Sequence, residues 1–138
     1  VVITPLQLGN LDSKRDWSDA EDFVDGVWKM LNQDAPQDYV LSSNETHSIR
    51  EFVVEAFNFG GFHREQCVWR GEGLDEKYFH GDDCLVEINK DFYRPAEVDL
   101  LLGDSNHARE QMGWKPKCNF LQLVRKMVDI DLQAAILP

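Results

Sequence analysis

Two short sequences of the form Ser-x-x-Glu constrain the fold most, because each marks the start of a helix. In this pattern the serine side chain accepts a hydrogen bond from the helix backbone, and the glutamate side chain accepts one from the serine N–H. The first lies at 18–21 and the second at 48–51, and apolar residues follow both at helical spacing. We therefore predict a helix over 18–34 and a second helix from Ser48 to Gly60.

Short stretches that alternate between apolar and polar residues predict strands beside these helices. The sequences at 66–70 and 84–88 have this pattern, and the apolar run at 39–42 is a further candidate. The apolar run at 98–104 is either a short strand or an extended run. The segment between the first two is acidic and contains glycines, so we expect a loop there.

Two more helix starts complete the pattern. Asp104 or Ser105 precedes a short helix that Gly113 ends, and Asn119 with Gln122 begins the last helix. Helices and short strands thus interleave along the chain, and the predicted fold class is α/β. The last helix is expected to bury the apolar residues Leu123, Val124, Met127, Val128 and Leu132.

The acidic composition excludes two classes of partner. The chain has 25 acidic and 14 basic residues among 138, with a formal net charge of −11. Nucleic acids and anionic membranes are bound by an extended positive surface, so we exclude both. A small anionic ligand needs only two or three well-placed cations. The positions of the few arginines are therefore the informative feature.

The cysteines and histidines give no sign of a disulfide framework or a metal site. The three cysteines are far apart without C-x-x-C spacing, and the four histidines form no H-x-x-x-H pair. We expect reduced thiols and no metal. No apolar run approaches the roughly 18 residues of a membrane span.

Arg15 lies just before the first predicted helix. A helix start offers backbone N–H groups and the positive end of the helix dipole, so an arginine beside it favours phosphate or carboxylate binding. The alternative is that Arg15 forms a surface ion pair with Asp12 or Asp16. The local pattern leaves both open.

Arg94 lies in the sequence "FYRPAEVD", where Pro95 biases it toward an extended conformation. Glu97 follows three residues later and is a candidate acceptor for a sugar hydroxyl. The alternative is again a surface ion pair, between Arg94 and Glu97, which contributes little to stability.

Five segments of the chain together resemble one enzyme family. They are "LGNLDSKRDW", "ETHSIREFV", "FYRPAEVDLLLGD", "GWKP" and "LVRKMVDIDL". Their order and spacing are similar to the carboxyl-terminal part of GDP-mannose 4,6-dehydratases, which are extended short-chain dehydrogenase/reductases. The resemblance runs over essentially the whole chain.

The resemblance implies a site for the nucleotide sugar GDP-mannose. Arg15 and Arg94 match the two arginines that hold the nucleotide diphosphate in related enzymes. Glu97 matches an acidic residue near the nucleotide ribose, and Asn10 and Lys14 lie in the same substrate-facing segment. The family converts GDP-mannose to a 4-keto-6-deoxy sugar by internal hydride transfer through NADP.

The catalytic part of the family pattern is absent from this sequence. No G-x-G-x-x-G opens a helix, and no tyrosine is followed four residues later by lysine. The glycines of "GEG" at 71–73 stand among acidic residues that would repel phosphate. The sequence also departs from the family at Ser18-Asp19, at 42–44 and over 62–83. We expect no catalytic residue in the chain, and interpret it as a fragment or relic that is inactive alone.

The expected architecture is the carboxyl-terminal portion of an extended short-chain dehydrogenase Rossmann-type fold with its small substrate-binding domain. Residues 1–47 would be the last part of the nucleotide-binding domain, and residues 48–138 the substrate-binding domain. The first helix would then lack the sheet on which it packs and would expose an apolar face. Self-association, or marginal stability with hydrophobic-dye binding, is the expected consequence.

Other functions stay open at this point. The chain could be a non-catalytic nucleotide-sugar-binding or interaction module, a part of another extended family member such as an epimerase, or a chain with no surviving function. By the resemblance, the intact enzyme is expected to be a cytoplasmic homo-oligomer.

Overall fold

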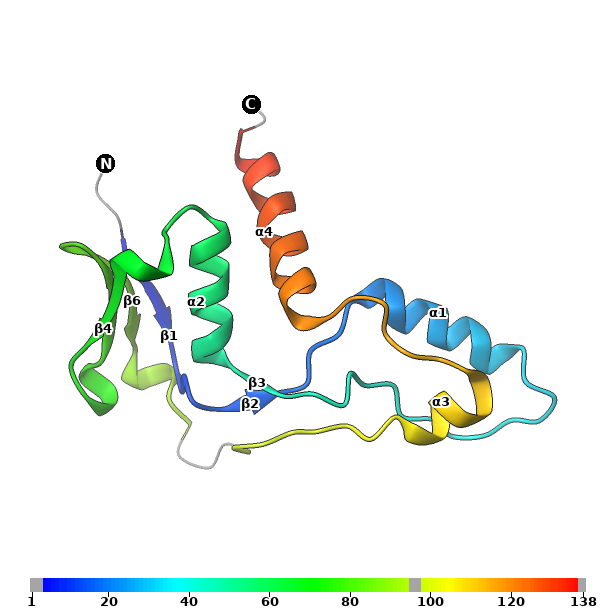
Figure 1. Ribbon diagram of the computed structural model, residues 1–138. Helices are drawn as coiled ribbons and strands as arrows, with labels where there is room; N and C mark the ends of the chain where they lie inside the picture. Colours follow the sequence, from blue (N-terminus) through cyan, green and yellow to red (C-terminus); the bar gives the residue numbers. More distant parts are fainter. Residues whose placement is uncertain (1–3, 95–97, 137–138) are drawn as a thin grey trace.

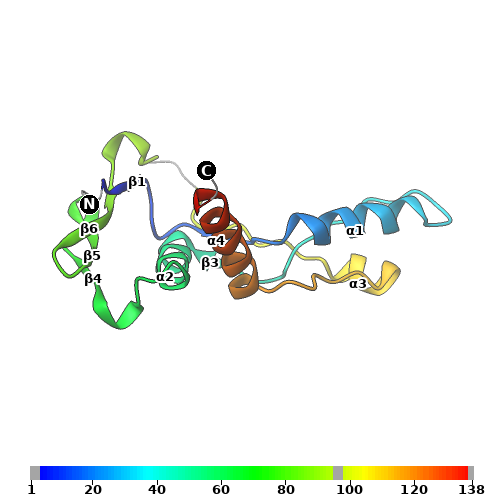
Figure 2. The same ribbon diagram turned by 90° about the horizontal axis from the view of Figure 1, so that it is seen from above.

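The computed structural model describes residues 4–94 and 98–136, which form a mixed α/β structure with two unlike ends. One end holds a four-stranded sheet with two helices beside it, and the other holds two helices joined by extended chain (Figures 1 and 2). The predicted α/β class is confirmed.

The four-stranded sheet has the order β1-β6-β5-β4. Strand β1 (Leu6–Leu8) runs parallel to β6 (Asp83–Ile88), whereas β5 (Lys77–His80) and β4 (Cys67–Arg70) continue the sheet in antiparallel order. The predictions at 66–70 and 84–88 are therefore confirmed. The prediction of a loop between them is wrong in part, because β5 forms there and is paired with a strand on each side.

The failure to predict β5 has a physical reason. The sequence "KYFH" is flanked by acidic residues and glycines, which mask a strand of only four residues. Tyr78 at its centre is 2% exposed and packs in the core between the sheet and helix α2 (Ile49–Phe59). Burial of this apolar side chain, rather than local propensity, stabilises the strand.

Helix α2 starts as the sequence predicts. The Ser48 side chain accepts a hydrogen bond from Glu51 N, the Glu51 carboxylate accepts one from Ser48 N, and Gly60 follows the last turn. Its inner face contributes Val53 to the core with Leu85 and Val86 of β6. Helix α4 (Phe120–Ile136) packs on the other side of α2 (Figure 1).

Helix α4 also begins as predicted, but only its first turns are buried. Asn119 and Gln122 exchange hydrogen bonds of 2.9 Å between side chain and backbone. Leu123 and Val124 are buried, whereas Met127 and Leu132 are 46% and 44% exposed. The predicted buried face is therefore wrong beyond the first turns, where the helix extends past its neighbours (Figure 1).

The first helix, α1 (Ala20–Leu31), starts one residue later than the capping-box pattern predicts and ends before residue 34. Asp19 is the cap, and its carboxylate accepts a hydrogen bond from Glu21 N at 2.9 Å. Ser18 Oγ is buried without a hydrogen-bond partner in the described part of the chain. The aspartate is the better acceptor because its charge also meets Lys126, at 2.8 Å.

Helix α3 (Asn106–Met112) lies beside α1 at the end away from the sheet. Gly113 ends it with φ of 61°, as the sequence predicts. Trp114 then turns inward, becomes fully buried, and donates a hydrogen bond from Nε1 to Asp22 O at 2.8 Å. This contact joins the "GWKP" segment to α1.

The strand predicted at 39–42 is wrong, because these residues form no strand in the structure. The segment at 98–104, predicted as a strand or an extended run, forms one bridge, between Leu100 and Lys14. The reason at 39–42 is that no strand of the described residues lies alongside it. The predicted division at 47/48 concerns two domains of a longer enzyme, and it stays a prediction.

Candidate functional site

A short pair of strands positions Arg15. Strand β2 (Lys14–Arg15) pairs with β3 (His47–Ser48), and on its other side the chain at 98–101 runs alongside. Lys14 N donates to Asp99 O at 2.8 Å, and Leu101 N donates to Lys14 O at 3.2 Å. The "LGNLDSKRDW" and "FYRPAEVDLLLGD" segments are therefore hydrogen-bonded neighbours.

The Arg15 guanidinium is held by backbone oxygens. Its Nη1 donates to Lys14 O and to Val98 O, both at 2.8 Å. Of the two carboxylates considered as its surface partners, Asp12 bonds to Arg50, and Asp16 bonds to the backbone of Ser43. Arg15 lies at a hollow of about 360 Å³, whose lining also includes Asp16, Phe23, Leu41, Ser42 and residues 101–103.

Arg94 is exposed and lies four residues before Val98, whose carbonyl contacts Arg15. It follows the single turn η3 (Lys90–Phe92). Glu97 lies outside the described residues. The structure thus places Val98 against Arg15. Convergence of the Arg15 and Arg94 guanidinium groups on one diphosphate stays a prediction.

Asn10 and Lys14, the other two predicted site residues, lie on the same stretch before and within β2. The Asn10 side-chain oxygen accepts a hydrogen bond from Asp12 N at 3.0 Å, which shapes the turn after β1. Lys14 is exposed. Both therefore have positions compatible with a substrate-facing edge, and their roles stay predictions.

A polar network that the sequence did not predict supports the segment carrying Arg15. The Asp16 carboxylate accepts hydrogen bonds from Ser43 N, Ser43 Oγ and Asn44 N, at 2.6–3.1 Å. Asn44 has φ of 65°, and its side-chain oxygen accepts from Ser105 N and Ser105 Oγ. Arg109 donates to Ser43 O and Ser105 Oγ. Three distant segments are thereby tied together beside Arg15.

Arg50 is a second residue that sequence reasoning missed. Its guanidinium makes two hydrogen bonds of 2.8–2.9 Å to Glu76 and one of 3.0 Å to Asp12, and it stacks 4.6 Å from the ring of Trp69. Partial burial opposes its charge, but the bonds to Glu76 and Asp12 outweigh this and raise the pKa of Arg50. The contact fixes the turn at Asp12 relative to the sheet.

No local signal could have identified these residues. Arg50 lies on a helix face that the pattern marks as exposed, and its partners are 38 and 26 positions away. The partners of Asp16 are 27 and 28 positions away. Only the fold brings such groups together.

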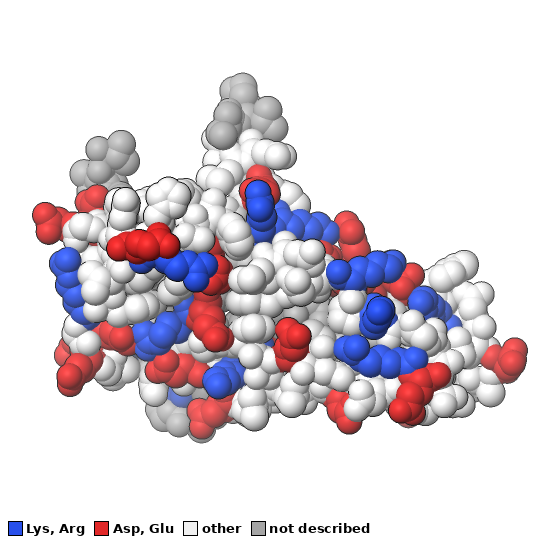
Figure 3. Space-filling view, in the orientation of Figure 1, with Lys and Arg blue, Asp and Glu red and all other residues white. Residues whose placement is uncertain are grey.

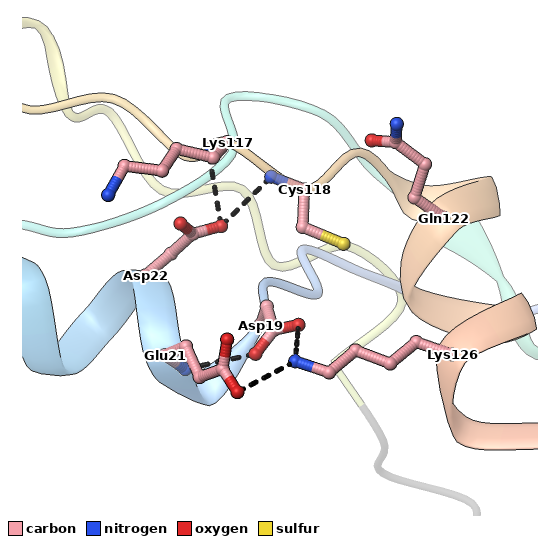
Figure 4. A pocket seen from close by; sticks show the side chains of 7 residues that line it. All are labelled: Asp19, Glu21, Asp22, Lys117, Cys118, Gln122 and Lys126. Carbon is pink, nitrogen blue, oxygen red and sulfur yellow. Dashed lines mark hydrogen bonds and ion pairs between the residues drawn. The ribbon is translucent and has the colours of Figure 1, made fainter. Parts of the chain in front are cut away.

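A second hollow, of about 370 Å³, lies between the start of α1 and the start of α4 (Figure 4). Asp22 Oδ2 accepts hydrogen bonds from the backbone N–H groups of Lys117 and Cys118, both at 3.0 Å. Lys126 Nζ contacts Asp19 at 2.8 Å and Glu21 at 3.2 Å. Every carboxylate that lines the hollow is thus already bonded, which indicates a structural junction.

The chemistry of this hollow does not indicate catalysis. Burial raises the pKa of the Cys118 thiol, and the nearby carboxylates Asp19 and Asp22 act in the same direction. The thiol is therefore protonated at neutral pH and is a poor nucleophile. Among the described residues no cluster of histidine, cysteine and acidic side chains could hold a metal ion.

Replacing Asp19 tests the junction through its pH dependence. The hydrogen bond from Lys126, then that from Glu21 N, lowers the pKa of Asp19 below its ordinary value of 3.8. Because the folded-state pKa is lowered, the ionised form adds stability above that value, and this stability is lost as the pH falls through the folded-state pKa. Asp19→Asn should lower the free energy of unfolding at pH 7, and the deficit should shrink below about pH 4.

The measurement is urea unfolding of both proteins from pH 3 to pH 7. Asparagine keeps the capping oxygen, so the change isolates the charge. Asp25→Asn is the matched control, since Asp25 lies on the same helix and makes only long ion pairs, with Lys29 at 3.7 Å and with Lys117 at 3.9 Å. A deficit independent of pH would show that the Asp19–Lys126 ion pair does not stabilise the junction.

Comparison with known proteins places these motifs in a family. The sequence model of the family described as GDP-mannose 4,6 dehydratase matches residues 3–127. A GDP-mannose 4,6 dehydratase of Drosophila melanogaster is 45% identical over 130 residues, which are 93% of this chain and 32% of that protein. The Homo sapiens enzyme of the same name is 42% identical over 130 residues, 93% of this chain and 34% of its own length.

Solved structures show the same fold at low identity. RMD from Pseudomonas aeruginosa, complexed with NADPH, has a TM-score of 0.69 and 21% identity, over 96% of this chain and 37% of that chain. UDP-glucose 4-epimerase from Thermotoga maritima, with UDP-glucose, has a TM-score of 0.71 and 12% identity, over 95% and 36%.

The predicted fold class, part of a Rossmann-type extended short-chain dehydrogenase, is thereby confirmed. The chain spans about a third of the length of the curated relatives that it matches. It belongs to the GDP-mannose 4,6-dehydratase family.

Proposed function

We propose that this chain supplies the nucleotide-sugar-binding part of a GDP-mannose 4,6-dehydratase. The whole enzyme would convert GDP-mannose to GDP-4-keto-6-deoxymannose with loss of one water. The observation that carries the proposal is the pairing of Lys14 with Asp99 and Leu101, which sets Arg15 against Val98, four residues after Arg94. Two arginines on neighbouring segments suit a diphosphate, because each guanidinium can donate two parallel hydrogen bonds.

The supporting contacts favour a rigid site. Arg15 is held by two backbone carbonyls, and Asp16 beside it accepts three hydrogen bonds. Rigid placement reduces the entropy lost on binding, which favours recognition of a charged ligand. Because the chain as a whole is acidic, the positively charged side chains of Arg15 and Arg94 are the groups here that would attract a diphosphate.

A nicotinamide cofactor does not fit the described residues. Strand β1 leads to β2 and not through a glycine-rich turn into a helix, which a dinucleotide site requires. The glycines with positive φ instead end helices or lie in turns; they are Gly61, Gly71, Gly73, Gly81 and Gly113. NADP would therefore be bound by the part of the enzyme that this chain does not match. The same part would also supply the catalytic acid and base.

The remaining expectations belong to the whole enzyme. The described residues contain no helix long and apolar enough to cross a membrane. We propose a cytoplasmic location and a homo-oligomeric state, because both are implied by the family resemblance. Neither depends on a contact in this chain.

A chimera tests the proposed function. In the Drosophila relative, this chain would replace the 130-residue region that it matches. The chimera should convert GDP-mannose to the 4-keto-6-deoxy product, and should leave UDP-glucose unchanged. The product is measured by chromatography against the unaltered relative. A folded chimera without turnover of GDP-mannose would contradict the proposal.

A further inference from the structure

The chain has glycines at two kinds of position, which require glycine for different reasons. Some have a positive φ, which other residues rarely adopt; they are Gly61, Gly71, Gly73, Gly81 and Gly113. Gly9, Gly26 and Gly103 have no such φ, yet at each of them a side chain would collide with its neighbours. Space, rather than backbone conformation, therefore accounts for glycine at these three positions.

Gly26 lets helix α1 pack closely on its neighbours. A methyl group there would come within 2.5 Å of the Leu41 side chain and 3.0 Å of Trp114 Nε1. The exposed apolar face predicted for this helix is confirmed on its other side, where Val24 and Trp28 are 69% and 67% exposed. Gly26 thus accounts for packing within the fold, whereas the other two glycines lie next to the segments that carry the candidate site.

Gly9 lies where the turn that leads to Arg94 packs on the end of β1. A methyl group at Gly9 would come within 2.5 Å of Phe92 O and 3.0 Å of Phe92 C. Both are backbone atoms, so no change of rotamer can relieve the overlap. The turn η3 would have to move by roughly 1 Å to restore an ordinary contact of about 3.5 Å. Arg94 follows Phe92 by two residues and would be displaced with it.

Hydrogen bonds hold the same turn against β1. Asn89 N donates to Leu8 O at 2.8 Å, and the Asn89 side chain donates to Gln7 Oε1 at 2.8 Å. The Asn89 side chain also accepts a hydrogen bond from Asp91 N, at 2.9 Å. These bonds draw η3 onto β1, and the absence of a side chain at Gly9 sets how closely the two segments approach.

Gly103 has the same relation to the chain beside Arg15. A methyl group there would overlap the Ser42 side chain, which is 4% exposed and donates a hydrogen bond to Asn44 Oδ1 at 2.9 Å. Because Ser42 is held in place, the chain at 98–103 would have to move away from it. Val98 in that chain accepts the hydrogen bond of Arg15 Nη1 at 2.8 Å, so the support of this guanidinium would move too.

We propose that Gly9 and Gly103 are positioning residues of the diphosphate site, Gly9 for Arg94 and Gly103 for Arg15. The inference rests on the proposed function, because it concerns the same two guanidinium groups. Each glycine acts by letting two backbone segments approach closely. Hydrogen bonds from a guanidinium to a phosphate oxygen require about 2.7–3.2 Å, so a shift of roughly 1 Å at the backbone disrupts the paired geometry.

The charge distribution makes placement the deciding factor. On the face shown in Figure 3, positive and negative side chains are interspersed and do not form an extended positive surface. The summed field of such a surface attracts an anion only weakly. Recognition of a diphosphate here would therefore depend on the exact positions of Arg15 and Arg94, which the two glycines set.

Double-mutant cycles in the chimera described above test both assignments. Gly9→Ala and Gly103→Ala should each weaken GDP-mannose binding about fivefold or more, because the displaced guanidinium loses its paired hydrogen bonds. When Arg94→Ala is already present, Gly9→Ala should weaken binding less than about twofold further. Gly103→Ala should behave in the same way with Arg15→Ala. A glycine with only a structural role would have its full effect in both backgrounds.

Two further variants separate displacement from a loss of folding. Ser42→Gly removes the atoms that collide with Gly103→Ala, so the double variant should bind within about threefold of the unaltered chimera. Asn89→Ala loosens η3 without adding an atom and takes the place of Gly9→Ala if that variant does not fold. It should weaken binding about threefold, and only while Arg94 is present.

Gly81→Ala is the matched control for stability. Gly81 lies in the turn between β5 and β6 with φ of 60°, so alanine is strained there, but nothing lies within 4 Å of the added methyl group. The variant should lower the melting temperature and change GDP-mannose binding less than about twofold.

The outcomes distinguish this inference from the proposed function. Additive effects of Gly9→Ala with Arg94→Ala, and of Gly103→Ala with Arg15→Ala, would overturn the positioning role. Unchanged binding by both glycine variants would also overturn it, and if the two arginine variants still weaken binding, the proposed function stands. Arginine variants that bind as tightly as the unaltered chimera would reject the diphosphate site and this inference together.

Discussion

Incubated with GDP-mannose and NADP, the isolated chain should form no 4-keto-6-deoxy product. Hydride transfer needs a bound cofactor in a fixed orientation, and the protein must supply that site. No glycine-rich turn in the described residues links a strand to a helix start, and we expect the cofactor to bind outside this chain. The expected effect is complete loss of turnover relative to the full-length Drosophila relative.

The tyrosines of the chain support the same expectation. None is followed four residues later by lysine, the pairing that the family resemblance implies for a catalytic tyrosine. Tyr78 is buried in the sheet, and burial raises its pKa further above the physiological range. The residues at the fourth position after Tyr39, Tyr78 and Tyr93 are Ser43, Asp82 and Glu97.

The assay is a long incubation at high protein concentration, with product detected by mass. The full-length relative, diluted until its rate is just detectable, sets the sensitivity. Product above the no-enzyme background from the chain alone would show that it contains catalytic groups, and would contradict the assignment of catalysis to the part that the chain does not match.

Local patterns predicted helix starts because the interactions that define them are local. The reciprocal bonds between Ser48 and Glu51, and between Asn119 and Gln122, join residues three positions apart. The predicted start of the first helix was wrong by one residue. The reason is that Asp19 is strengthened as the cap by Lys126, which lies 107 positions away in the sequence. Strand β5 was missed because its burial against α2 is decided by the fold.

The candidate site divides in the same way. The family resemblance predicted Arg15 and Arg94 as site residues. In the structure, the segments that carry these two motifs are joined by hydrogen bonds. The partners that hold the site rigid, Arg50 and Arg109 among them, act on residues 26 to 66 positions away. Sequence spacing alone does not encode such contacts, so they became visible only in the structure.

The proposed grip on the diphosphate predicts a large effect on binding. A charge-assisted hydrogen bond contributes roughly 1.5–3 kcal/mol, and tenfold in affinity corresponds to about 1.4 kcal/mol. Arg15→Ala or Arg94→Ala in the chimera should therefore weaken GDP-mannose binding about tenfold or more. Arg94→Lys should also weaken it, because one ammonium cannot reproduce two parallel guanidinium bonds.

Two arginines outside the two motifs that carry Arg15 and Arg94 are the controls. Arg64 pairs with Glu55 of α2 at 2.8 Å and its side chain is 49% exposed, and the Arg125 side chain on α4 is 68% exposed. Alanine at either position should change binding less than about twofold, because surface ion pairs contribute little. The melting temperature of each variant separates a loss of binding from a loss of folding.

The most direct measurement is calorimetric titration of GDP-mannose into the chimera and its Arg15→Ala, Arg94→Ala and Arg64→Ala variants, all shown to be folded. The predicted result is a dissociation constant raised about tenfold or more by each of the first two changes and unchanged by the third. Equal affinity in all four proteins would show that Arg15 and Arg94 do not hold the diphosphate, and would contradict the nucleotide-sugar site proposed for this chain.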